Sequence, residues 1–169
     1  MIFGAGNGLG HVDEDWLTHA LDSRVLGLPV KLCAPEEMIW HKGFVMARDR
    51  YDGADVAHLL ITFGDGLDWS RLLARFRDHW RVLLSHLILL GYVYPGHRGV
   101  VPSWVQKLLL SRLEQEPALA ATESEGVCRG PFLSRADYRQ AIEHWGYQTD
   151  CPAPLELAGE RGADPVGPG

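Results

Sequence analysis

The stretch that decides the fold covers residues 35–60 and reads PEEMIWHKGFVMARDRYDGADVAHLL. Pro35 suits the first turn of a helix, where its missing N–H costs nothing. Glu36 and Glu37 follow it and complement the positive end of the helix dipole. We therefore expect a helix over residues 35–50.

Further helices are expected after this stretch. Asp52 offers an N-cap oxygen, with Asp55 at a capping-box-like spacing, for a helix over residues 54–64. Asp68 repeats the device for residues 69–80. In that segment large apolar side chains recur at helical spacing and predict a core-facing stripe. The stripe consists of Trp69, Leu72, Leu73, Phe76 and Trp80.

Three later segments also have helical patterns. Residues 79–95 are rich in leucine and predict a helix that is buried on most sides. Its residue His86 is expected to be hydrogen-bonded in the core or at an interface. Ser103 is expected to cap a helix over residues 104–116. Ser134 is expected to cap another over residues 135–146, which ends on a glycine.

The amino-terminal part has weaker patterns. Residues 2–3 resemble the end of a strand that leads into a glycine-rich loop. Residues 13–23 predict a short helix with Asp13 as its N-cap. Residues 25–32 predict an extended segment, in which Pro29 favours an edge position.

Composition excludes several classes of function. The chain has 169 residues and a formal charge of −6, so it is not expected to bind nucleic acid or anionic membranes non-specifically. Its longest apolar run is shorter than the roughly 20 residues that span a bilayer. An odd number of widely spaced cysteines fits neither a disulfide framework nor a zinc site. We expect a cytoplasmic protein; the cysteines are Cys33, Cys128 and Cys151.

The familiar catalytic and metal-binding motifs are incomplete. The glycines of residues 4–10 match neither the dinucleotide-binding fingerprint nor a P-loop, which leaves a structural loop or a substrate-contacting loop. Asp13 and Asp15 would diverge on a helix and are interpreted as first-turn acids that complement its dipole. The eight histidines lack metal-ligand spacing, so no metal site is assigned.

Lys42 is the most informative charged residue. On a continuous helix its neighbours are all apolar: Met38, Ile39, Val45 and Met46. One interpretation is snorkelling, in which the stem packs and the ammonium reaches water. The other is a lysine directed at an anion such as a nucleotide phosphate. The pattern alone leaves both open.

Residues 35–60 resemble the distal signature of bacterial nucleotidyltransferase-like proteins of the polymerase-beta-like superfamily. In that signature a helix with a lysine is followed by arginine and then by an aspartate-rich helix start. The similarity continues through residues 67–95 and 127–147, and covers roughly residues 1–147. It implies an α/β (α+β), mainly helical fold: the remnant of a nucleotidyltransferase sheet followed by a helical bundle.

The resemblance implies a division of the chain and roles for five residues. Residues 1–50 would be the distal part of the nucleotidyltransferase-like core, 51–147 a helical domain and 148–169 a disordered tail. Lys42 would contact the triphosphate of a nucleoside triphosphate (NTP). A polar hinge between the two halves would be formed by Arg48, Arg50, Asp52 and Asp55. From the residues alone, Arg48 and Asp52 are an i,i+4 pair across a helix end.

The chain departs from the pattern of this family at the metal site. Enzymes of this kind hold two Mg²⁺ with an acid pair after a glycine turn and a third acid on a later strand, and this chain lacks the turn and the pair. We expect a truncated protein, a start assigned too far downstream, or a protein that lost catalysis. The intact form would transfer a nucleoside monophosphate from NTP to an acceptor. The alternative is a non-catalytic helical interaction protein.

Overall fold

The computed structural model describes Leu9 and residues 14–115 and 126–152. It confirms a mainly helical α+β protein, with two small antiparallel sheets among these residues. The helices are α1 (Glu14–Thr18), α2 (Pro35–Gly43), α3 (Gly53–Phe63), α4 (Trp69–Phe76), α5 (Trp80–Val93), α6 (Ser103–Gln115) and α7 (Arg139–Glu143). The strands are β1 (Leu21–Val25), β2 (Leu28–Leu32), β3 (Met46–Ala47) and β4 (Arg50–Tyr51). The strand expected at residues 2–3, the glycine-rich loop and Asp13 lie outside the described residues, apart from Leu9.

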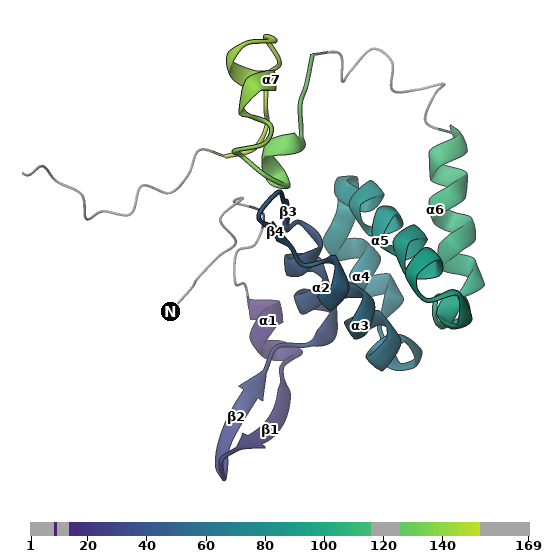
Figure 1. Cartoon of the computed structure of the whole chain (residues 1–169). Helices are drawn as coiled ribbons and strands as arrows, with labels where there is room; N and C mark the ends of the chain where they lie inside the picture. Colours follow the sequence, from purple (N-terminus) through teal and green to yellow (C-terminus); the bar gives the residue numbers. More distant parts are fainter. Residues whose placement is uncertain (1–8, 10–13, 116–125, 153–169) are drawn as a thin grey trace, which may run out of the picture.

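The core forms where α2, α3, α4 and α5 pack together (Figure 1). The single helix expected over residues 69–80 is wrong, because α4 ends at Phe76 and α5 begins at Trp80. The burial predicted for the stripe is confirmed, because its four members on α4 and Trp80 are all buried. Asp68 caps α4 as expected: its Oδ1 accepts the Arg71 N–H at 2.9 Å. Side chains on both sides of residue 50 share this core. Those that are fully buried include Ile39, Val56, Leu60, Leu72, Phe76 and Leu83.

The helix expected over residues 35–50 is too long, because α2 ends at Gly43. The Gly43 carbonyl accepts a hydrogen bond from Nε2 of His86 on α5 at 2.9 Å. Phe76 packs so closely that a Cβ on Gly43 would lie 3.1 Å from the ring. The chain then turns into the short β3–β4 hairpin. The expectation that the histidine of the leucine-rich helix is hydrogen-bonded in the core is confirmed.

The amino-terminal helix is also shorter than expected. It ends at Thr18, and Leu21 begins a two-stranded hairpin that projects from the helical body (Figure 1). The predicted extended segment at residues 25–32 is therefore not one strand. It contains the turn Leu26–Gly27, in which both residues have positive φ, as hairpin turns of this length favour.

The leucine-rich helix is confirmed as α5, but its predicted burial on most sides is wrong for the second half. Leu83, Leu84 and Leu90 are buried, whereas four side chains of the second half are exposed: Ile88, Leu89, Tyr92 and Val93. None of the helices in the described residues is long and apolar enough to cross a membrane.

The carboxyl-terminal segment packs beside the β3–β4 hairpin, where the Leu133 carbonyl accepts the Met46 N–H at 3.4 Å. Ser134 Oγ accepts the Asp137 N–H at 3.2 Å and so caps a turn, but α7 begins only at Arg139. Gly146 follows α7 with a positive φ, as expected of a stop signal. Residues 148–152, which the sequence placed in the tail, belong to the structure, and Cys151 is buried in the core. The rest of that tail lies outside the described residues.

Candidate functional site

Lys42 and two aspartates meet where α2 ends and α3 begins. Lys42 Nζ lies 2.7 Å from Asp55 Oδ2 and 3.1 Å from Asp52 Oδ2. Arg50 on β4 approaches Asp52 from the other side, with Nη2 at 3.1 Å from Oδ2. The structure therefore brings together four of the five residues assigned from the sequence. We call these four residues the Lys42 cluster.

Burial differs across the Lys42 cluster. The side chain of Asp52 is 11% exposed and that of Lys42 is 24% exposed, whereas Asp55 is 53% exposed. Hydrogen bonds from Arg50 and then Lys42 hold the pKa of Asp52 below its usual range. The bond to Asp55, followed by the bond to Asp52, raises the pKa of Lys42. Lys42 therefore stays protonated, with one inner partner and one outer partner.

Arg48 does not join this cluster. Its backbone N–H donates to Asp137 Oδ2 at 2.9 Å, and its exposed guanidinium lies 3.7 Å from the other oxygen of Asp137. The expected helical pair between Arg48 and Asp52 is wrong, because α2 has already ended and Arg48 lies in the turn between β3 and β4.

The capping role expected of Asp52 is also not observed. Asp52 occupies the N-cap position of α3 but makes no side-chain cap bond. Its carboxylate is instead taken by Lys42 and Arg50, and Asp55 turns to Lys42 rather than completing a capping box. Ion pairs with neighbouring elements have displaced the local cap.

The surroundings of Lys42 differ from the apolar neighbourhood that a continuous helix would give it. Val45 and Met46 lie beyond the end of α2, so they are not its helical neighbours. The ammonium is held by two carboxylates rather than only reaching water. The four charges of the Lys42 cluster sum to zero, and the half-exposed Asp55 is its most accessible carboxylate. An anion that displaced Asp55 would meet a lysine that is already charged.

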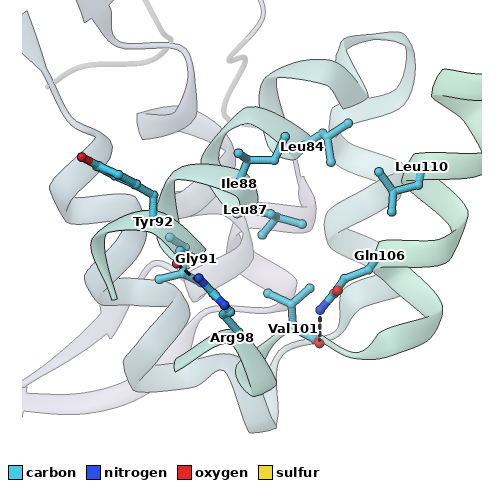
Figure 2. A pocket seen from close by; sticks show the side chains of 10 residues that line it. Leu84, Leu87, Ile88, Gly91, Tyr92, Arg98, Val101, Gln106 and Leu110 are labelled. Atoms are coloured by element: carbon cyan, nitrogen blue, oxygen red, sulfur yellow. Dashed lines mark hydrogen bonds between the residues drawn. The ribbon is translucent and has the colours of Figure 1, made fainter. Parts of the chain in front are cut away.

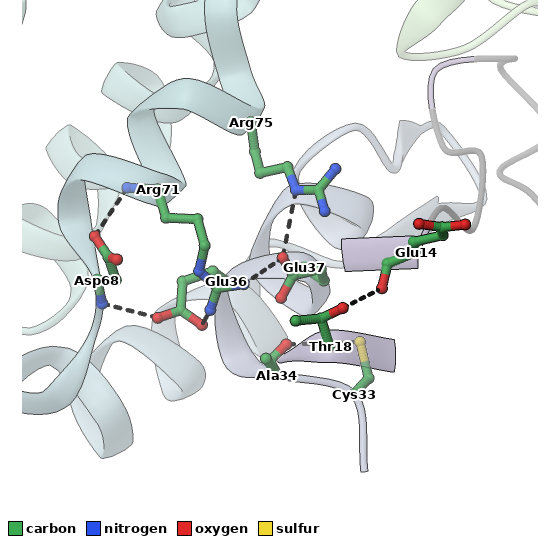
Figure 3. A network of polar contacts seen from close by, with 9 residues as sticks. All are labelled: Glu14, Thr18, Cys33, Ala34, Glu36, Glu37, Asp68, Arg71 and Arg75. Atoms are coloured by element: carbon green, nitrogen blue, oxygen red, sulfur yellow. Dashed lines mark hydrogen bonds and ion pairs between the residues drawn. The ribbon is translucent and has the colours of Figure 1, made fainter. Parts of the chain in front are cut away.

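A second charged group, at the other end of α2, was missed by sequence reasoning (Figure 3). Arg71 on α4 donates through Nη1 to Glu37 Oε1 at 2.5 Å and through Nη2 to Glu36. Arg75 donates through Nε to Glu37 Oε1 at 3.3 Å. Glu36 also accepts the Asp68 N–H at 2.8 Å, and both glutamates are buried. We call the two glutamates and two arginines the α2–α4 clamp.

A signal for the clamp was present in the sequence. Arg71 and Arg75 are four residues apart, so they share one edge of α4 beside its apolar stripe. Glu36 and Glu37 were explained by the helix dipole alone, which left no reason to seek a partner. Only the packing of α2 on α4 shows that these charges meet.

Other side chains that catalysis could use are less favourable. Burial, and next the nearby charge of Glu37, raise the pKa of the Cys33 thiol to about 11, so it remains protonated and a poor nucleophile. Burial lowers the pKa of His86, whose Nε2 is occupied by the Gly43 carbonyl. Within the described residues, no three His, Cys, Asp or Glu side chains are arranged to hold a metal ion.

Comparison of the chain with protein-family models, with curated proteins and with solved structures finds no match.

Proposed function

We propose that this chain is a nucleotidyltransferase-like protein that binds a nucleoside triphosphate, with Lys42 in contact with its phosphates. The observation that supports the proposal is the charged Lys42 in the last turn of α2, whose outer partner on α3, Asp55, is half exposed. Exposed ion pairs contribute little to stability, so a phosphate can replace Asp55 at small cost. Asp52 would remain bound to Arg50 and keep the site in shape.

The proposal is limited to binding. Transfer of a nucleoside monophosphate requires acids that hold two Mg²⁺ against the attacking and leaving oxygens. The described residues offer no group that fits such a site. We therefore expect a nucleotide-binding protein that transfers no nucleotide by itself to RNA or protein. Magnesium-dependent labelling from radioactive NTP that EDTA abolishes would contradict this part of the proposal.

Titration calorimetry with ATP tests the binding role of Lys42. Loss of a charge-assisted phosphate contact removes on the order of 1.5–3 kcal/mol of binding free energy, so Lys42→Met should weaken ATP binding at least tenfold. Lys107→Met is the matched control, because Lys107 is exposed on α6, away from the Lys42 cluster. Equal ATP affinity in wild type and Lys42→Met would remove Lys42 from the site.

A second candidate function is a non-catalytic interaction protein, which the β1–β2 hairpin favours. Its register places Leu21, Val25, Leu28 and Leu32 on one face, and all four side chains are exposed. The opposite face has the ion pair between Asp22 and Lys31. A two-stranded hairpin with an uncovered apolar face is marginally stable in water, which favours a partner that covers it.

Leu28→Lys tests this second candidate because it places a charge on the apolar face, next to the turn of the hairpin. Sedimentation velocity should show an assembly in the wild type that is lost in the variant. Arg24→Lys, on the opposite face, should leave the assembly intact. The interaction role would be contradicted if the wild type stays monomeric at every concentration and binds the same partners as Leu28→Lys.

A further inference from the structure

A pocket of about 410 Å³ lies between the second half of α5 and α6, remote in the sequence from the Lys42 cluster (Figure 2). It exists because α6 buries only Val105 and Leu109, so the two helices touch along a narrow line. Most of the lining is aliphatic, and its volume is within the range of small-molecule sites. The aliphatic side chains include Leu84, Leu87, Ile88 and Leu110.

One end of the pocket is polar. Arg98 Nε donates to the Gly91 carbonyl at 3.1 Å, which fixes the guanidinium beside α5. No carboxylate among the described residues pairs with Arg98. Gln106 donates through Nε2 to the Val101 carbonyl at 3.0 Å, so its amide oxygen remains beside the pocket as an acceptor. In Figure 2 both polar side chains lie on the side of the pocket away from Leu84.

A single arginine at the end of an apolar pocket selects for charge. Two of its nitrogens remain for an anion, and a planar guanidinium matches a carboxylate through two parallel hydrogen bonds. A cation would be repelled, and a neutral apolar molecule would gain no ion pair from the guanidinium, which is exposed to water in the free protein. The complementary ligand therefore has one negative group and an apolar body.

The length of the apolar body follows from the helix. Gly91, which anchors Arg98, and Leu84 at the far end of the lining are seven residues apart on α5, or about 10 Å along its axis. An extended covalent chain advances roughly 1.2 Å per bond, so about eight to ten carbons span this distance.

We infer that the α5–α6 pocket binds a monocarboxylate with an unbranched alkyl chain of about eight to ten carbons. Its carboxylate lies against Arg98, and its chain lies along Leu87 and Ile88 toward Leu84. This site is independent of the nucleotide proposal, since it shares no residue with the Lys42 cluster.

Titration calorimetry with decanoate tests the inference. The wild type should bind one decanoate saturably, and Arg98→Gln should weaken binding at least tenfold, because it removes a charge-assisted contact. The exposed Arg24 on the β1–β2 hairpin supplies the control, and Arg24→Gln should bind like the wild type. Leu110→Glu, at a half-exposed wall position, should also weaken binding because it places a negative charge beside the ligand.

Three results would overturn the inference. The first is the absence of saturable decanoate binding to the wild type. The second is equal affinity for decanoate and decan-1-ol, or for wild type and Arg98→Gln, which would make the pocket a non-selective apolar surface. The third is that the wild type does not bind decanoate but binds an amphipathic helical peptide with one glutamate. That result would assign the pocket to a protein partner.

Discussion

The charged groups at the two ends of α2 differ in how deeply they are buried. At its amino-terminal end Glu36 and Glu37 are buried and fixed by Arg71 and a second arginine of α4. At its carboxyl-terminal end Lys42 is paired with acids whose burial ranges from nearly complete to half exposed. One helix therefore holds a group that fixes its packing and a group that keeps an accessible partner.

The difference shows that burial, rather than the number of ion pairs, decides what a charged cluster does. Removing one partner from a buried pair leaves an uncompensated charge in the interior, which is strongly destabilising. Removing one partner from an exposed pair leaves a charge that water solvates. The α2–α4 clamp should therefore control stability, and the Lys42 cluster should be free to serve binding.

The largest expected effect is at the clamp. Arg71→Met keeps most of the apolar stem but removes the guanidinium from both glutamates, so the free energy of unfolding should fall by about 3–5 kcal/mol. Urea denaturation monitored by tryptophan fluorescence measures this fall. Arg112→Met, at an exposed position on α6, is the control.

A loss below about 1 kcal/mol for Arg71→Met would make the clamp equivalent to a surface pair. The contrast between the two ends of α2 would then be wrong.

An intermediate effect is expected from pH at the end of α2. Burial lowers the pKa of His86 below its usual 6.5, so the unfolded chain binds a proton in a range where the folded chain does not. Stability should be constant above pH 6.5 and fall as the pH is lowered, by up to about 1.4 kcal/mol per pH unit for one such histidine. Urea denaturation between pH 7.5 and 5 measures the slope.

Part of that slope should disappear in His86→Gln, while the exposed His97 provides the comparison: His97→Gln should keep the full slope. His41 and His79, whose pKa values burial also lowers, would account for the remainder. A slope that His86→Gln leaves unchanged would show that His86 is already solvated.

The smallest expected effect is at the Lys42 cluster. Lys42→Met should change the free energy of unfolding by less than about 1 kcal/mol, because Asp55 returns to water and Asp52 keeps Arg50. The same urea experiment measures it beside Arg71→Met. A loss as large as that of Arg71→Met would assign Lys42 to the structural framework.

The sequence predicts the helices well where the signal is local. The stripe from Trp69 to Trp80 and the cap at Asp68 depend on spacing within a few residues, and both are confirmed. The end of α2 at Gly43 bonds His86, which is 43 residues away, so the spacing of apolar residues along the helix does not predict it. The same applies to the β1–β2 hairpin, where pairing of two strands replaces the helix expected up to residue 23 and the single extended segment expected over residues 25–32.

The site shows the same limit. The sequence singled out Lys42, Arg50, Asp52 and Asp55, and the structure brings all four together although they belong to three different elements. It misassigned Arg48, because that inference assumed an unbroken helix. It also missed the clamp, because an acid at a helix start has a sufficient local explanation and its distant partner is set by packing.

The most direct test of the account is ATP titration calorimetry on Asp55→Asn beside Lys42→Met. If Asp55 is the accessible partner that a phosphate replaces, Asp55→Asn removes a competing negative charge. It should therefore strengthen ATP binding, whereas Lys42→Met should weaken it at least tenfold. Opposite shifts of the two variants are the result that the account predicts. Equal affinity in both variants and the wild type would show that the Lys42 cluster is a structural ion pair and not a phosphate site.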